Sequence, residues 1–291
     1  MSVFVNMPGP ATQISILSIK SWLFTPGTKP DFFSRASATG AGALIIDLED
    51  SVAPADKDTA RRNALDYLAA KAPDHIPCAV RINPPDSQLG DRDVQLFLAS
   101  SATADFVILP KSESLLTIRR VMEALTLAQK QTRVIALIET IQGIQALDQI
   151  ASSDYRPDAF LFGAADMAAD LGAAVEWEPL LFARSRVVMA GASAGIPIID
   201  APFFNLADQD GLQKEASAAM KLGFHGKCAI HPSHVAVIND VFNPSAAEID
   251  QARRAIAASQ QGVGQVDGRM VDAASIRNAR TILARAGIVV P

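Results

Sequence analysis

The chain has 291 residues, of which 49% are hydrophobic and 20% charged, and its formal net charge is −5. This balance predicts a large buried core and excludes a disordered chain. The acidic net charge argues against general binding to nucleic acid or to membrane surfaces, which requires basic patches. No run of 18 apolar residues is present, so we expect no membrane span. The first 20 residues do not read as a signal peptide, and we expect a cytoplasmic protein.

Eight short apolar segments recur along the chain. They are continuously apolar rather than alternating, as strands covered on both faces must be. Helical patterns separate them, among them residues 56–71, 114–130 and 210–223, the last of which ends on Gly223, a typical C-cap. The predicted strands are residues 21–26, 43–49, 78–83, 105–110, 133–139, 158–163, 197–202 and 227–232.

This alternation of strand and helix is typical of a (β/α)8 TIM barrel, an α/β fold. An open doubly wound sheet is the alternative, but no glycine-rich phosphate loop follows the first strand. We predict a barrel over residues 21–242, an N-terminal extension at 1–20, and C-terminal helices with a lid segment at 243–291. In that tail, a helix starting near Ser245 and a second, later helix flank the Gly- and Asp-rich residues 262–272.

Polar residues stand where each apolar run stops. In such barrels the active site lies at the carboxyl ends of the strands, so we expect these residues to collect at one face. They are Asp47, Glu49 and Asp50 after the second strand, Arg81 and Asn83 after the third, Lys111 after the fourth, Glu139 and Thr140 after the fifth, Asp166, Asp200 and His231.

Two of these acids suggest a metal site. Glu139 and Asp166 follow adjacent strands, and an all-oxygen ligand set favours Mg²⁺ or Mn²⁺ over zinc. The alternative is that the two acids pair with arginines or cap the following helices. Arg81 lies inside an apolar strand and needs an anionic partner, either an acid of the second strand or a substrate carboxylate. Arg81 can have both partners at once, because an acid can orient an arginine that also binds a ligand.

Cys78 and Cys228 lie in apolar runs, and neither has the spacing of a zinc ligand. We therefore expect two free, buried thiols.

The chain resembles the citrate lyase β-subunit-like branch of the HpcH/HpaI aldolase/citrate lyase family. The motifs come in the family's order and cover nearly the whole chain. They are SWLFTPGTKPDFF, GALIIDLEDSVAPADKDTAR, VRIN, LPKSES, ALIETIQGI, FGAADMAADLG, GKCAIHPSHVAVIN and DGRMVD.

The resemblance implies a Mg²⁺-dependent carbon–carbon lyase in the form of a homo-oligomeric barrel, a trimer or hexamer. Its members cleave 3-hydroxyacyl-CoA thioesters to acetyl-CoA and a 2-oxo acid by a retro-aldol, Claisen-type reaction. Citramalyl-CoA is the first expectation here, with malyl-CoA and citryl-CoA open. The implied partners are these small molecules alone, with CoA entering as part of the substrate.

The same resemblance assigns residues. Glu139 and Asp166 become the metal ligands, with Glu139 also facing the substrate, and Arg81 binds the carboxylate of the oxo-acid half. We expect Asp47 to orient Arg81, and Glu49 to accept hydrogen bonds from metal-bound water.

Further assignments lie outside that cluster. Asp272, in DGRMVD, matches an acid on a lid that reaches the active site of a neighbouring subunit, and turn formation is its alternative role. Lys29 replaces a usual arginine and is the expected CoA contact. Met167 replaces a usual aromatic residue and is expected to reshape the acyl pocket. His231 is expected to fix the loop before Pro232.

Two other functions remain open. The aldolase branch of the family, which acts on free oxo-acids without CoA, carries a histidine base where this chain has Asp50. This difference argues against a class II pyruvate aldolase. The other alternative is the β subunit of a multi-subunit citrate lyase, in which the acyl group is held on a carrier protein.

Overall fold

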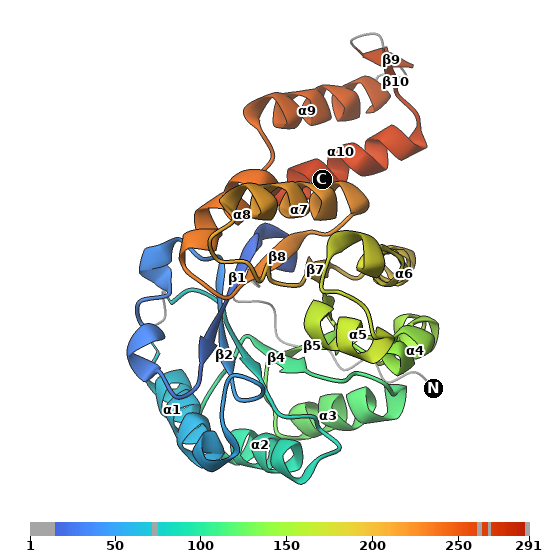
Figure 1. Ribbon diagram of the computed structural model, residues 1–291. Helices are drawn as coiled ribbons and strands as arrows, with labels where there is room; N and C mark the ends of the chain where they lie inside the picture. Colours follow the sequence, from blue (N-terminus) through green and yellow to red (C-terminus); the bar gives the residue numbers. More distant parts are fainter. Residues whose placement is uncertain (1–14, 72–74, 261–263, 267–268, 289–291) are drawn as a thin grey trace, which may run out of the picture.

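A closed barrel of eight parallel strands forms the body of the molecule in the computed structural model, which describes residues 15–71, 75–260, 264–266 and 269–288 (Figure 1). The first strand pairs with both the second and the eighth, so the sheet has no free edge. The predicted TIM barrel is confirmed, and the open-sheet alternative is wrong. The strands are β1 Ser21–Pro26, β2 Ala43–Asp47, β3 Cys78–Arg81, β4 Phe106–Leu109, β5 Arg133–Ile138, β6 Ala159–Phe162, β7 Ile198–Asp200 and β8 Gly226–Ala229.

Helices surround the barrel (Figure 1). The three helical segments named from the sequence correspond to α1 Lys57–Ala70, α3 Leu115–Leu127 and α7 Gln209–Leu222, and Gly223 follows the last of them with a φ of +123°. Between β1 and β2 the chain forms only short 3-10 turns, η2 Pro30–Phe32 and η3 Ser37–Thr39, in place of an α-helix. The barrel helices are α1 Lys57–Ala70, α2 Gln88–Ala99, α3 Leu115–Leu127, α4 Ile141–Ala151, α5 Ala164–Leu171, α6 Trp177–Ala194, α7 Gln209–Leu222 and α8 Ser233–Phe242, and another 3-10 turn, η4 Pro54–Asp56, precedes α1.

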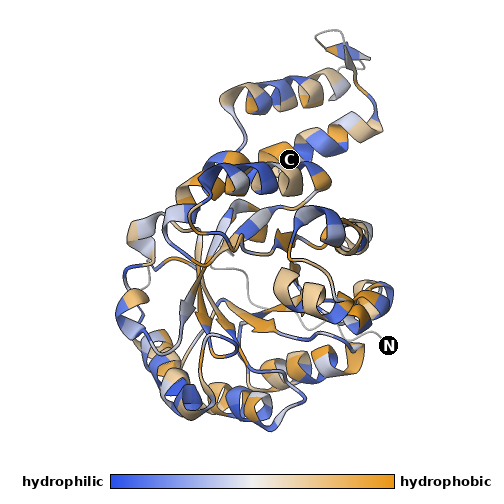
Figure 2. Ribbon diagram, viewed as in Figure 1, coloured by the Kyte–Doolittle hydropathy of each residue, from blue (hydrophilic) through white to orange (hydrophobic). Residues whose placement is uncertain are grey.

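Alternate residues of each strand face opposite sides of the sheet, and this divides the core in two. One set fills the inside of the barrel, for example Ile45, Ala79 and Leu137. The other set, with Ile46 and Ile198, packs between the strands and the helices. Hydrophobic residues accordingly concentrate in the strands, whereas the helices carry both hydrophilic and hydrophobic residues (Figure 2). The same alternation decides which residue at a strand end reaches the mouth of the barrel.

The C-terminal residues form a separate unit beyond α7 and α8 (Figure 1). It contains α9 Ala246–Gln260, a short antiparallel pair, β9 Gln265–Val266 and β10 Arg269–Met270, and α10 Ala273–Arg285. The two helices pack on each other around a small core of their own. The helix expected from near Ser245 is present, and the expected lid segment includes a β-hairpin that the sequence did not indicate.

The N-terminal extension lies mostly outside the described residues, which begin at residue 15 and start with the turn η1 Ile16–Ser18. In the described part of the chain, no helix combines the length and the apolar character needed to cross a bilayer.

Candidate active site

A cleft of about 360 Å³ opens at the carboxyl ends of the strands. Its floor is apolar, with Leu137, Leu161 and Phe24, and acids and one arginine stand around that floor. The polar lining residues are Asp47, Asp50, Ser51, Arg81, Glu139 and Asp166. Strand alternation explains the grouping, because the residues of β2, β3 and β5 two positions before Asp47, Arg81 and Glu139 all point into the barrel.

Arg81 is held by the acids of the second strand. Asp47 accepts two hydrogen bonds, from Nε and Nη2 of Arg81, each at 2.7 Å. Nη1 lies 2.9 Å from Glu49 Oε2, in an ion pair whose alignment does not make a hydrogen bond, and donates to exposed Asp50 at 3.2 Å. The guanidinium also lies over the ring of Phe24, 5.0 Å from its centroid. The expected contact between Asp47 and Arg81 is therefore present.

These contacts leave Arg81 one side on which to bind a ligand. Asp47 is 1% exposed and its pair with Arg81 is fixed, whereas the side chain of Asp50 is 60% exposed. Burial raises the pKa of Asp47, but the bonds from Arg81 outweigh that effect and hold it below its usual value. An incoming carboxylate can thus replace Asp50 on Nη1 without disturbing Asp47.

Glu139 follows β5 and is buried at 2% exposure. Its Oε1 accepts a hydrogen bond from the backbone N–H of Lys111 at 2.9 Å. Gly163 follows the neighbouring strand β6, and a Cβ at that position would lie 2.8 Å from Glu139 Oε2 and still closer to Glu139 Cβ. The carboxylate is therefore fixed by a peptide N–H on one side and by a glycine backbone on the other.

Asp166 lies in the first turn of α5, with its side chain 38% exposed and lining the cleft. The ammonium of Lys111 connects it to the buried acids, at 3.5 Å from Asp166 Oδ2, 3.9 Å from Glu139 Oε1 and 4.0 Å from Glu49 Oε1. Glu139 and Asp166, expected together from the sequence, do face a common space.

The cluster carries more acids than cations. Asp47, Glu49, Asp50, Glu139 and Asp166 are five carboxylates against Arg81 and Lys111, which gives −3 when all are ionised. Burial, with further effects of neighbouring charges, raises the pKa of Glu49 to about 7. Burial and the charges of Glu49 and Asp166 raise the pKa of Glu139 well above its usual range. An excess of carboxylates around one open cleft favours the binding of a hard divalent cation.

Two residues expected at this face point elsewhere. Asn83 donates to Asp93 Oδ2 at 2.6 Å and is buried beside α2. Asp200 faces outward from β7, where it accepts hydrogen bonds from Arg184 of α6 at 3.0 Å and Lys227 of β8 at 2.5 Å. Alternation places Asp200 on the helix side of the sheet, because Ile199 occupies the inside.

Met167 also departs from expectation. It is 1% exposed and packs in the layer between strands and helices, not in the lining of the cleft. Any effect of Met167 on an acyl pocket would therefore be indirect, and that expectation stays a prediction.

Three further expected residues lie outside the cleft lining. Asp272 is the N-cap of α10, where it accepts a hydrogen bond from Ser275 N–H at 2.7 Å. Lys29 is exposed at the start of η2. His231 is exposed, and its Nδ1 accepts the backbone N–H of Ser233 at 3.2 Å, at the first residue of α8. This contact fixes the turn at Pro232, as expected of His231.

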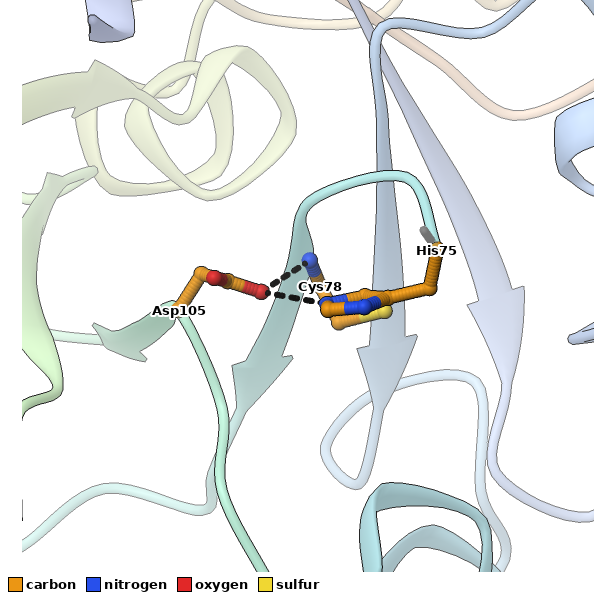
Figure 3. A group of neighbouring side chains, drawn as sticks. All are labelled: His75, Cys78 and Asp105. Carbon is orange, nitrogen blue, oxygen red and sulfur yellow. Dashed lines mark hydrogen bonds and ion pairs between the residues drawn. The ribbon is translucent and has the colours of Figure 1, made fainter. Parts of the chain in front are cut away.

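Another group of titratable residues lies at the opposite, amino ends of β3 and β4 (Figure 3). His75, Cys78 and Asp105 bring possible ligand atoms within 4.8 Å of one another. Asp105 Oδ2 is already engaged by Lys71, by His75 and by the backbone N–H of Cys78. Burial raises the pKa of the Cys78 thiol to about 12. We interpret the group as an anchor for the strand starts, and both cysteines are free and buried as expected.

Sequence reasoning missed Phe24 and Gly163. Strand alternation would have identified Phe24, because it lies two residues after Trp22, which faces the inside of the barrel on β1. The need for glycine at 163 depends on a contact between neighbouring strands, which spacing along one strand does not reveal.

Comparison with known proteins identifies the family. The profile of the HpcH/HpaI aldolase/citrate lyase family matches residues 20–232, and the profile of a C–C bond lyase of the TIM-barrel fold matches residues 182–289. The chain belongs to the HpcH/HpaI aldolase/citrate lyase family. The resemblance read from its motifs is thereby confirmed.

Relatives of this family member cover nearly its full length. An L-malyl-CoA/beta-methylmalyl-CoA lyase from Rhodobacter capsulatus is 34% identical, over 91% of this chain and 93% of the relative. The citrate lyase subunit beta of Haemophilus influenzae is 33% identical, over 92% of this chain and 96% of the relative. These relatives are carbon–carbon lyases. The prediction that this chain is a carbon–carbon lyase is confirmed.

Solved structures agree. CitE from Mycobacterium tuberculosis, in complex with magnesium, acetoacetate and coenzyme A, is 32% identical with a TM-score of 0.77, covering 94% of this chain and all of that one. RipC from Yersinia pestis is 42% identical with a TM-score of 0.72, covering 81% of this chain and all of that one. This HpcH/HpaI family member therefore shares both fold and sequence with proteins of known structure.

Proposed function

We propose that this protein is a Mg²⁺-dependent lyase that cleaves a 3-hydroxyacyl-CoA thioester into acetyl-CoA and a 2-oxo acid. The observation that carries the proposal is the arrangement of Glu139, Asp166 and Arg81 around one cleft, with an excess of carboxylates and an apolar floor. Its relatives support it, since one is named a malyl-CoA lyase and another was solved with magnesium, acetoacetate and coenzyme A.

Glu139 and Asp166 would hold the metal, with Mn²⁺ as an alternative ion. The residues fit a divalent cation because the ammonium of Lys111 already stands as a positive charge among Glu139, Asp166 and Glu49. A bound Mg²⁺ supplies positive charge that acidifies the substrate hydroxyl and polarises the carbonyl formed from it. Glu49 lies behind the two ligands and would orient water beside them.

Arg81 would hold the carboxylate of the oxo-acid half. Its orientation is set by the two bonds to Asp47, so the Nη1 edge that Asp50 now occupies points toward the cleft. This fixed donor would place the bond to be broken over the floor of the cleft and stabilise the developing oxo acid.

The cleft favours one substrate class over another. Arg81 is the one cationic side chain among the described lining residues, and Leu137, Leu161 and Ile230 are apolar neighbours. A product with a single carboxylate and a methyl group, pyruvate, suits this lining better than oxaloacetate with its two carboxylates. We therefore place citramalyl-CoA first, malyl-CoA second and citryl-CoA third.

The acetyl-CoA enolate that departs must be protonated at its methylene carbon. Asp272 would do this from a neighbouring copy of the chain, and Lys29 would contact the CoA. The hydrogen bond from Ser275 N–H lowers the pKa of Asp272, which favours the carboxylate, the form that acts as base in the condensation direction. In the cleavage direction this carboxylate would first take up a proton, such as the one lost by the substrate hydroxyl, and then pass it to the enolate carbon.

The test is an assay of the purified protein with Mg²⁺ and, in parallel, each of the three CoA thioesters, a carrier-protein thioester and free oxo-acid substrates, with the products measured separately. We expect cleavage that EDTA abolishes, and a loss of at least about a thousandfold in Glu139→Gln. Cleavage of free oxo-acid substrates alone would favour a pyruvate aldolase. Activity only with a carrier-protein thioester would favour a citrate lyase β subunit. No product from any CoA thioester would refute the proposal.

A further inference from the structure

Lys111 has an unusual backbone. Its φ is +47°, in the left-handed region that residues other than glycine rarely adopt. Among the described residues other than glycine, only Gln129 shares this feature, and Gln129 lies after α3, outside the lining of the cleft. A strained conformation persists only where its surroundings enforce it, and such positions concentrate at functional sites.

The surroundings of Lys111 are the turn after β4. Ser112 N–H donates to Leu137 O at 3.2 Å, and Glu113 N–H donates to Lys111 O at 2.8 Å. Lys111 N–H itself donates to Glu139 Oε1 at 2.9 Å. The left-handed backbone therefore positions a carboxylate of the proposed metal site.

The side chain of the same residue brings a charge to that site. Its ammonium lies within 4.0 Å of Glu139, Asp166 and Glu49, which come from three different elements. None of the three contacts is short, and the side chain is 39% exposed. The ammonium is thus held by the combined field of the acids and has solvent into which it can withdraw.

We propose that Lys111 is the resident counter-cation of the acidic cluster, whose ammonium balances the carboxylates until a divalent cation binds and then withdraws from among them. This inference rests on the proposed metal site. It makes Lys111 a positioning residue with two separable parts: the backbone sets Glu139, and the side chain competes with the metal. The competition weakens metal binding and makes the ion exchangeable.

The test is calorimetric titration of the full-length protein with Mg²⁺, and it needs no substrate. Lys111→Met keeps the side-chain length and, like lysine, places a residue other than glycine at the left-handed position, but it removes the charge. We expect its Mg²⁺ Kd to fall by roughly fivefold. Lys111→Gly also lacks the charge and should bind more tightly as well. Lys111→Arg retains a cation and should bind like the unaltered protein. Gln129→Gly relieves the other left-handed position and should leave the Kd unchanged.

The outcomes distinguish a failure of this inference from a failure of the proposed metal site. If Lys111→Met binds Mg²⁺ no more tightly than Lys111→Arg, the ammonium does not compete and the inference fails. If only Lys111→Gly binds more tightly, relief of the backbone is the cause and the inference also fails. If the unaltered protein does not bind Mg²⁺, or Glu139→Gln binds it equally well, the proposed metal site fails and this inference with it.

Discussion

Gly163 and Glu139 face each other across the neighbouring strands β6 and β5. Because an added Cβ at 163 would lie 2.8 Å from Glu139 Oε2 and still closer to Glu139 Cβ, Gly163→Ala should displace that carboxylate and shift the ends of the two strands locally. We expect the Mg²⁺ Kd to rise by at least about tenfold, as measured by calorimetry, with an unchanged circular dichroism spectrum. A Gly163→Ala protein that binds Mg²⁺ normally would show that Glu139 is not held as described.

His225 links pH to stability. It precedes β8 and accepts the backbone N–H of Ile198 at Nδ1, 3.1 Å away. Burial first, and then the charge of Arg285, lowers the pKa of His225 to about 4. The ordinary value in the unfolded chain is about 6.5, so between these two values the unfolded state binds the extra proton. The contribution of His225 is therefore complete above about pH 6.5 and is lost as the pH falls toward 4.

The expected loss across that window is up to about 3 kcal/mol of unfolding free energy. Urea denaturation at pH 7, 5.5 and 4.5 measures it. His225→Gln keeps an acceptor for Ile198 N–H but does not titrate, so its stability should depend less on pH than that of the unaltered protein. Equal pH dependence in both proteins would exclude His225 as the source.

At the scale of elements, variants of Asp272 distinguish its two proposed roles, as the N-cap of α10 and as the catalytic acid. As N-cap, Asp272 satisfies the Ser275 N–H, and asparagine does so about as well, whereas alanine costs roughly 1 kcal/mol of helix stability. As catalytic acid, only the carboxyl group serves. Asp272→Asn should therefore keep α10 stable in hydrogen exchange, yet lose exchange of the acetyl-CoA methyl protons in deuterated water. If only Asp272→Ala loses that proton exchange, Asp272 acts as a cap alone.

Elements differ in how well the sequence reveals them. The eight strands were predictable because parallel strands buried on both faces must be continuously apolar. Their polar ends showed Arg81, Glu139 and Asp166, which the structure brings to one cleft. Asp200 was misplaced because the side of the sheet on which a strand residue points depends on register, and a short strand such as β7 gives little pattern from which to fix it.

Other features depend on contacts between distant segments. Two hydrogen bonds hold the left-handed backbone of Lys111: its own N–H donates to Glu139, directly after β5, and the N–H of Ser112 donates to Leu137 O of β5. The local sequence around Lys111 does not encode these contacts. The hairpin of β9 and β10 has only two residues in each strand, too few for a period to appear.

At the scale of the whole molecule, the position of the C-terminal unit predicts a shared active site. Asp272 does not line the cleft of its own barrel, and the unit that carries it stands beyond α7 and α8 (Figure 1). We expect Glu139→Gln and Asp272→Asn proteins each to be inactive alone. Mixed trimers that contain both chains should recover about one third of full activity, because in each of them one site of three pairs an intact barrel with an intact lid.

Two differently tagged chains and two successive affinity steps would isolate the mixed oligomers, and the thioester assay would measure their activity. A mixture of two unaltered chains carrying the same tags is the control. If mixed oligomers form but remain inactive, each lid serves its own barrel. If the Asp272→Asn protein is active alone, Asp272 has no catalytic role.

The outward-facing charges of the last two strands bear on the order in which the barrel forms. Asp200 and Lys227 are register partners on β7 and β8, fully buried on the helix side, and their further partners, Arg184 and Glu215, come from α6 and α7. A sheet that closed before those helices docked would leave these charges without full compensation. We therefore expect the seam between β7 and β8 to assemble together with α6 and α7, so that a chain cut after β6 leaves an open sheet and not a smaller barrel.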